Sequence, residues 1–95
     1  MWNAKLMLTT TITIINKLGL HARAAAKLVK LASRFECDVQ LKRKQRVVNG
    51  KSIMAVMLLA ASKGTEVDVI TNGVDEIEAT EAILQLINNK FDEGE

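Results

Sequence analysis

The segment Gly19-Leu20-His21-Ala22-Arg23-Ala24-Ala25-Ala26 marks the point where the sequence changes from one hydrophobic period to another. Before it, residues 6–14 place apolar side chains at most of their even positions and threonines between them, the two-residue period of a half-buried strand. After it, residues 22–35 place apolar side chains at three- and four-residue spacing, which is typical of an amphipathic helix. The segment therefore predicts a glycine-bearing turn that leads from a strand into the start of a helix.

His21, the only histidine of the chain, lies at this predicted helix start. A helix N-terminus attracts anions, because its first backbone N–H groups are unpaired and the macrodipole is positive there. An imidazole can act as a nucleophile near neutral pH, and the planar guanidinium of Arg23 can make paired, charge-assisted bonds to phosphate. Together these features predict a histidine that receives a phosphoryl group. The alternative is a structural or simply exposed histidine.

The predicted helix has a basic face, and residues 21–35 contain no acid. Its cations fall within an arc of roughly 60° at 100° per residue. The first of them lies in the first helical turn, where the interaction of a positive charge with the macrodipole is unfavourable by about 0.3–1 kcal/mol. A bound anion would remove this unfavourable interaction. The face is either solvated or a docking surface for an acidic partner. The basic side chains are those of Arg23, Lys27, Lys30 and Arg34.

The rest of the sequence predicts three more strands and two more helices. Residues 38–43 and 46–48 alternate in polarity around a turn at Lys44-Gln45, and residues 67–71 form the last strand. Ser52 precedes a short helix as a candidate N-cap, and Asp75 precedes a longer one with Glu78 at the spacing of a capping box. The order β-α-β-β-α-β-α predicts an α+β open-faced sandwich with the helices on one face of the sheet. The acidic residues 92–95 are expected to fray.

Composition limits the classes of protein to which the chain can belong. The chain has 95 residues, of which 48% are hydrophobic. This length and composition predict that residues 1–95 form a single domain with an aliphatic core. The lone cysteine, Cys37, excludes an internal disulfide and fits a reducing compartment, and without a Cys/His cluster we expect no metal and no cofactor. The N-terminus lacks the order of a signal peptide, and the longest apolar run, residues 53–61, is far below the ~20 residues of a membrane span. We therefore expect a soluble cytoplasmic protein with no membrane insertion.

Nucleic-acid binding is a weak alternative. The basic residues 42–46 and the basic helix face would supply positive charge, but the net charge is only +2 and aromatic residues make up 3% of the chain. Aromatic side chains are the stacking platforms of single-strand binders. We expect no nucleic-acid partner.

A second candidate site begins at Ser52. In the structural interpretation this serine only caps its helix, and Ile53, Met54 and Met57 belong to the core. In the functional interpretation Ser52 accepts a phosphate that the helix dipole stabilises, beside a flexible methionine-bearing surface that binds several partners.

The two motifs Gly19-Leu20-His21-Ala22-Arg23 and Lys51-Ser52-Ile53-Met54 resemble those of the HPr family, the histidine-containing phosphocarriers of the bacterial phosphoenolpyruvate-dependent phosphotransferase system. The similarity covers nearly the whole chain and includes the order of the elements. It implies an antiparallel sheet of strand order 1-4-2-3 covered on one face by three helices. It also implies a phosphoryl carrier with a phosphohistidine intermediate, not an enzyme with turnover of its own.

The resemblance assigns roles to the candidate residues. His21 would accept the phosphoryl group on Nδ1 from phosphorylated enzyme I and pass it to enzyme IIA domains. Arg23 and the backbone N–H groups near Ala22 and Arg23 would stabilise that group. Ser52 would be the regulatory serine of an HPr kinase/phosphorylase. The partner surface would comprise Lys27, Lys30, Ile53, Met54 and Met57. A small carrier that alternates between partners is expected to be a monomer.

One position departs from the family pattern. The family usually has proline directly after the active-site arginine, whereas this chain has Ala24 and no proline anywhere. Alanine leaves the first helical turn less restrained than proline would. The departure keeps a second function open, in which the protein is mainly a regulatory binding module controlled by phosphorylation of Ser52.

Overall fold

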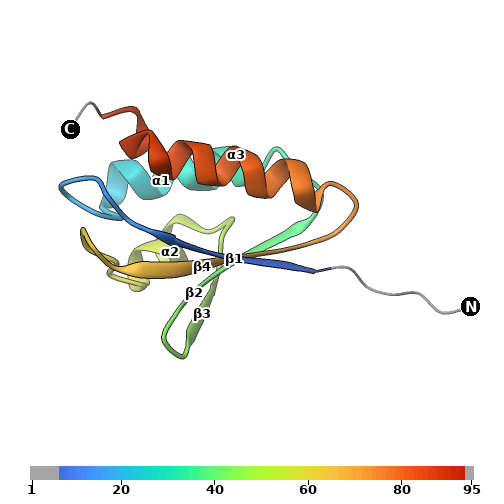
Figure 1. Ribbon diagram of the computed structural model, residues 1–95, viewed down its shortest axis with the longest axis horizontal. Helices are drawn as coiled ribbons and strands as arrows, with labels where there is room; N and C mark the ends of the chain where they lie inside the picture. The colour runs from blue at the N-terminus through green and yellow to red at the C-terminus, as the bar shows by residue number, and fades with distance from the viewer. Residues whose placement is uncertain (1–6, 94–95) are drawn as a thin grey trace, which may run out of the picture.

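The computed structural model describes residues 7–93 and contains one four-stranded antiparallel sheet with helices on one face (Figure 1). The strand order is β1-β4-β2-β3, as the resemblance implies. The elements in chain order are β1 (Leu8–Thr13), α1 (Ala22–Ala32), β2 (Asp38–Arg43), β3 (Arg46–Asn49), α2 (Ile53–Leu58), β4 (Glu66–Asn72), α3 (Glu76–Asn88) and the short 3-10 helix η1 (Lys90–Asp92).

The pattern of each strand explains its place in the sheet. β4 lies between β1 and β2, and its alternate residues Val67, Val69 and Thr71 are buried. It pairs with β1 from Leu8↔Thr71 onward. β2 and β3 form the predicted hairpin, and Lys44 adopts a positive φ of 56° in its turn. The two-residue period therefore placed the inward face of these strands correctly.

α1 and α3 lie side by side over the sheet, and α2 packs against α1 and β3 (Figure 1). The buried stripe of α1 is apolar, as its spacing predicts, and α3 buries Ala79, Ile83 and Ile87. Ser52 is the N-cap of α2, because its hydroxyl accepts a hydrogen bond from the Ala55 N–H at 3.3 Å. The buried apolar side chains of these helices and of the sheet form one core, which is mainly aliphatic.

The predicted capping box at α3 is wrong. Asp75 is the N-cap residue, but its side chain does not bond to the first turn of the helix. The carboxylate instead accepts the backbone N–H groups of Glu36 and Cys37, both at 2.9 Å, at the start of β2. These two N–H bonds, that of Glu36 first, hold the pKa of Asp75 below its usual value. A side chain at a helix start thus ties α3 to the segment that enters the sheet.

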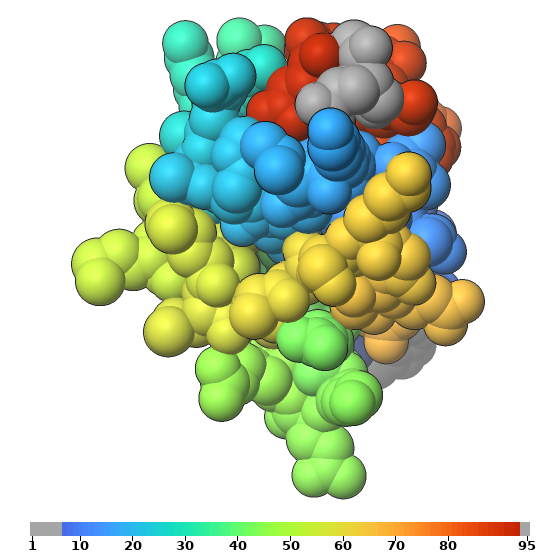
Figure 2. Space-filling model, turned by 90° about the vertical axis from the view of Figure 1, so that its left-hand side faces the viewer, coloured from blue at the N-terminus to red at the C-terminus, as the bar shows by residue number. Residues whose placement is uncertain are grey.

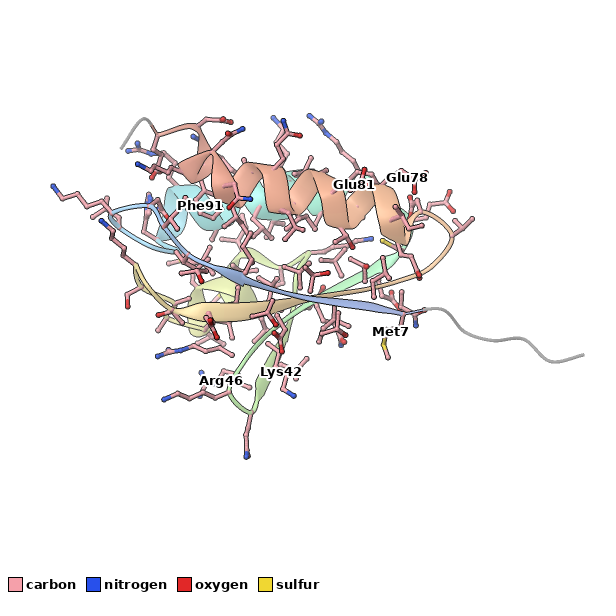
Figure 3. The ribbon with its side chains drawn as sticks, in the orientation of Figure 1. Met7, Lys42, Arg46, Glu78, Glu81 and Phe91 are labelled. Atoms are coloured by element: carbon pink, nitrogen blue, oxygen red, sulfur yellow. The ribbon has the colours of Figure 1, made fainter. Side chains whose placement is uncertain are left out.

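The expectation that the acidic tail frays is also wrong for Asp92 and Glu93, and residues 94–95 lie outside the described part of the chain. Lys90, Phe91 and Asp92 all have φ between 55° and 60° and turn the chain back after α3. Phe91 is completely buried (Figure 3). An aromatic side chain that enters the core fixes this C-terminal turn, which comprises residues 90–93.

Candidate functional site

A tight loop sets the start of α1. Gly19 has a φ of +67°, and a Cβ at this position would collide with the Ala61 backbone. Leu20 donates its N–H to the Ala61 carbonyl at 2.9 Å. The buried Asn16 side chain donates to the Gly19 carbonyl at 2.9 Å. Only glycine combines this handedness with such close packing, so the predicted glycine turn is confirmed.

His21 occupies the N-cap position of α1, with extended backbone angles. Its carbonyl accepts the first helical hydrogen bond, from the Ala25 N–H at 2.8 Å. The N–H groups of Ala22, Arg23 and Ala24 have no intrahelical partner, because they begin the helix. The imidazole makes no capping bond to them. The ring is 24% exposed. The structure therefore places a partly accessible imidazole beside the positive end of a helix.

The first turn of α1 contains no acidic residue. Arg23 is exposed two residues after His21, and Lys30 and Arg34 are exposed further along the basic face. Lys27 is only partly exposed, because its ammonium donates a 2.6 Å hydrogen bond to the carbonyl of Phe91. The predicted basic face thus divides into exposed cations and one lysine engaged inside the molecule.

The C-terminal turn places Glu93 against His21. Nε2 of His21 and Oε2 of Glu93 lie 2.8 Å apart, and the other carboxylate oxygen lies 3.4 Å from the side-chain nitrogen of Asn16. Glu93 is 7% exposed. Neither Glu93 nor Asn16 stands out in the sequence. The apolar Phe91 among polar neighbours is the one sequence signal that the chain returns to the core at this point.

The second candidate site adjoins the first on the surface. Figure 2 shows the start of α1 in blue between the C-terminal segment in red and the α2 segment in yellow. Ser52 is partly exposed at the start of α2. Ile53, Met54 and Met57 are 43%, 79% and 41% exposed, so of the two interpretations the one that places them in the core does not hold. Such a patch of exposed apolar side chains marks a candidate interaction surface.

The basic residues 42–46 lie around the β2–β3 hairpin. Arg43 donates to the carbonyl of Leu59 at 2.8 Å and Arg46 to that of Leu58 at 2.9 Å, so both satisfy the C-terminal carbonyls of α2. Lys42 and Arg46 point away from the face that α1 and α3 cover (Figure 3). The structure uses two of these cations to hold α2 in place.

Cys37 is buried beside Asp75. Burial, followed by the interaction with the Asp75 carboxylate, raises the pKa of this thiol to about 11. Within residues 7–93, no group of three or more His, Cys, Asp or Glu side chains could hold a metal ion. In the same part of the chain, none of the helices is long and apolar enough to cross a membrane.

Comparison with known proteins is consistent with this geometry. Residues 8–89 match the family model described as the PTS HPr component phosphorylation site. The phosphocarrier protein HPr of Pseudomonas aeruginosa is 61% identical over 85 residues, which cover 88% of this chain and 94% of that protein. The HPr-C-His crystal structure from Thermoanaerobacter tengcongensis has a TM-score of 0.88 at 44% identity and covers 90% of this chain and 97% of its own. An HPr dimer from the same organism has a TM-score of 0.72 at 45% identity, with coverages of 86% and 94%.

The match extends over most of this chain and over most of each relative, and the solved relative shares its fold. The chain therefore belongs to the HPr family, the phosphocarrier proteins of the phosphotransferase system.

Proposed function

We propose that this protein accepts a phosphoryl group on Nδ1 of His21 from phosphorylated enzyme I and relays it to enzyme IIA domains. The observation that supports this most directly is the position of His21 as a partly exposed N-cap with no acid in the following turn. Nε2 is engaged by Glu93, which leaves Nδ1 as the ring nitrogen for the reaction. Family membership supports the carrier role.

The surroundings of His21 fit a negatively charged ligand. The N–H groups of Ala22 and Arg23 lie in the first turn and would donate to phosphoryl oxygens. The exposed guanidinium of Arg23 would add a charge-assisted bond. In the transfer step, a bond forms between Nδ1 and phosphorus, and the donor's bond to phosphorus breaks with its electron pair. In the onward transfer, an acceptor group of the enzyme IIA domain forms a bond to phosphorus, the bond from Nδ1 to phosphorus breaks and its electron pair returns to Nδ1, so the carrier is regenerated.

Incubation with enzyme I and phosphoenolpyruvate tests this proposal. We expect an acid-labile adduct of one phosphoryl group that His21→Ala abolishes and Ser52→Ala retains. Arg23→Ala should slow its formation by about tenfold or more, because one charge-assisted bond contributes roughly 1.5–3 kcal/mol. If His21→Ala still forms the labile adduct, another residue is the acceptor and the proposal is wrong.

We also propose a regulatory role for Ser52, favoured by its position beside exposed Ile53, Met54 and Met57. A phosphate at Ser52 would add about −1.5 to −2 charges next to this apolar patch and change which partners bind there. HPr kinase/phosphorylase with ATP should give an acid-stable adduct that Ser52→Ala abolishes. If only this adduct forms and enzyme I gives none, the protein is mainly a regulatory binding module.

We propose that successive partners bind one shared face that includes Lys27, Lys30 and the apolar patch, with the carrier as a monomer. Light scattering at increasing protein concentration tests the oligomeric state. A constant mass of one chain supports alternate use of this face. A mass that rises to two chains with concentration would contradict it, and a crystal structure of an HPr dimer is known from Thermoanaerobacter tengcongensis.

A further inference from the structure

The C-terminal turn adopts a conformation that needs compensation. Lys90, Phe91 and Asp92 have φ values of 56°, 55° and 60°, and none of them is glycine. Residues with a Cβ adopt the left-handed region only at a cost in free energy. Burial of Phe91 and the 2.6 Å bond from Lys27 to its carbonyl offset that cost. Backbone held in this way by its surroundings is a common feature of functional sites.

The turn delivers a carboxylate to the imidazole. Glu93, the last residue of this turn, is 7% exposed and lies 2.8 Å from Nε2 of His21. Its other oxygen lies 3.4 Å from the amide nitrogen of the fully buried Asn16, which is itself held by the Gly19 carbonyl. A carboxylate removed from water needs such partners. Thus the segments before α1 and after α3 together fix the position of this group.

We propose that Glu93 is a positioning residue for phosphoryl transfer, which orients the His21 ring and balances its charge. This inference rests on the proposed role of His21 as phosphoryl acceptor. An ionised carboxylate only accepts hydrogen bonds, so Nε2 is the donor and carries the proton. In the neutral ring the lone pair then lies on Nδ1. The same division of labour operates wherever a carboxylate orients a reactive histidine.

The carboxylate also matters during transfer. When the bond from Nδ1 to phosphorus forms, the donor leaves with its electron pair and the Nε2 proton stays in place, so the ring becomes positively charged. Glu93 offers a negative charge on an oxygen 2.8 Å from Nε2, the nitrogen that carries this proton. In a partly buried position this attraction is stronger than in water. Glu93 therefore stabilises the phosphorylated ring, and it keeps Nε2 from competing as a nucleophile.

The opposite role is an inhibitory cover, in which the C-terminal turn blocks access to His21. The two roles predict opposite effects when the contact is removed. Loss of a positioning residue slows transfer, whereas loss of a cover accelerates it. Glu93→Gln keeps an acceptor oxygen but no charge, and Glu93→Ala removes both. Asp92→Asn is the matched control, because Asp92 is exposed in the same turn and asparagine tolerates its positive φ.

The first measurement needs no phosphoryl donor. The chain has a single histidine, so the ring ¹⁵N and N–H signals in an NMR spectrum are unambiguous. We expect a slowly exchanging Nε2–H signal in the unmodified protein and in Asp92→Asn, and its loss in Glu93→Ala. If the Nε2–H of the unmodified protein exchanges fast, the inference is wrong, whether or not His21 accepts a phosphoryl group.

The second measurement uses phosphoramidate, a small donor whose P–N bond breaks with release of ammonia. It has no protein surface to impose a choice of nitrogen. We expect phosphate on Nδ1 alone in the unmodified protein, Asp92→Asn and Glu93→Gln, and a mixture of Nδ1 and Nε2 products in Glu93→Ala. An unfolded chain would expose both ring nitrogens and give a mixture for that reason alone, so equal melting temperatures of the variants are the control for folding.

The third measurement is transfer from phosphorylated enzyme I. We expect kcat to fall about tenfold in Glu93→Ala with a smaller change in KM, the lower end of the effect seen when a carboxylate that orients a metal-bound histidine is removed. Glu93→Gln should lose rate while it keeps the nitrogen preference. Unchanged or faster transfer in both variants would refute the positioning role, and faster transfer would support a cover. If the unmodified protein is not phosphorylated at all, the proposed function fails instead.

Discussion

The ammonium of Lys27 donates a 2.6 Å hydrogen bond to the backbone carbonyl of Phe91, and this bond joins α1 to the C-terminal turn. Lys27 lies one helical turn after the first residues of α1, so the same helix that presents His21 also holds the segment that presents Glu93. The geometry of the site therefore depends on a cation for which the sequence predicted a place on the basic face, either solvated or in contact with a partner.

Replacement of Lys27 by methionine tests this link. Lys27→Met keeps the apolar stem and removes the donor, so we expect the free energy of unfolding to fall by about 1 kcal/mol. The amide of Glu93, which bonds to the Lys90 carbonyl at 3.0 Å, should exchange faster with solvent. Lys30→Met is the control, because Lys30 is exposed on the same helix. Equal amide exchange in the two variants would rule out this anchoring role.

Gly19 should be among the positions least tolerant of a side chain. Gly19→Ala forces a left-handed backbone, at a cost of about 1–2 kcal/mol, and pushes Cβ into the Ala61 backbone. Overpacking of this kind adds roughly 1–3 kcal/mol. Gly64→Ala is the matched control, since Gly64 has a φ of +91° but no atom within 4 Å of its virtual Cβ. Urea denaturation should show a larger loss for Gly19→Ala, and similar losses would mean that the close contact relaxes freely.

Asp75 should make stability depend on pH in acid. Its pKa is lower in the folded protein than in the unfolded chain, because the Glu36 and Cys37 N–H groups stabilise the charged form. The charged carboxylate contributes its full stabilisation at pH values above the pKa of Asp75 in the unfolded chain. This stabilisation is lost as the pH falls through the lower pKa of the folded protein. We expect Asp75→Asn to be less stable than the unmodified protein at pH 7, with a difference that narrows below about pH 4. Glu78→Gln, at an exposed acid of the same helix, should show no such narrowing in urea titrations.

Cys37 should be nearly inert in the folded protein. Only the thiolate reacts with disulfide reagents, and a rise of the pKa from 9.0 to about 11 lowers the thiolate fraction at pH 8 by about a hundredfold. We expect slow reaction with Ellman's reagent in buffer and rapid reaction in urea. The rate in buffer should rise with pH up to about 11. Fast labelling at pH 8 without denaturant would show that the thiol is neither buried nor protonated.

Ser52 should contribute modestly to stability through its cap. Its hydroxyl accepts the Ala55 N–H at 3.3 Å, a long bond, so we expect Ser52→Ala to cost about 0.5–1 kcal/mol. Ser52→Asp should restore the loss, because aspartate caps the helix and its charge favours the N-terminus. Thermal unfolding of the three proteins decides this. Equal destabilisation by alanine and aspartate would show that the cap is unimportant and that the serine matters for other reasons.

Local pattern was sufficient for much of the fold. Val67, Val69 and Thr71 alternate in the sequence and are buried on one face of β4. Ser52 directly precedes an apolar stretch and caps α2. Gly19 precedes His21 by two residues, and the chain turns there with a positive φ. Each of these features depends on neighbours a few residues away, so the sequence reports them directly.

Partners far along the chain were less accessible to such reasoning. Asp75 has the spacing of a capping residue, yet it bonds to Glu36 and Cys37, almost forty residues earlier. Exposed Ile53 and Met54 carry the same hydrophobic signal as buried Val56. The polarity of a side chain indicates whether it needs a hydrogen-bond partner or an apolar contact, but it does not indicate which segment of the chain provides that contact.

By itself, the sequence determined the order of strands and helices, the turn before α1 and the two motifs that contain His21 and Ser52. Only the tertiary structure decided that Lys27 holds Phe91 and that Glu93 lies against the imidazole. The reason is physical: periodicity and capping act over single turns, whereas a three-residue left-handed turn forms only when contacts with distant segments, here those that bury Phe91 in the core, offset its cost.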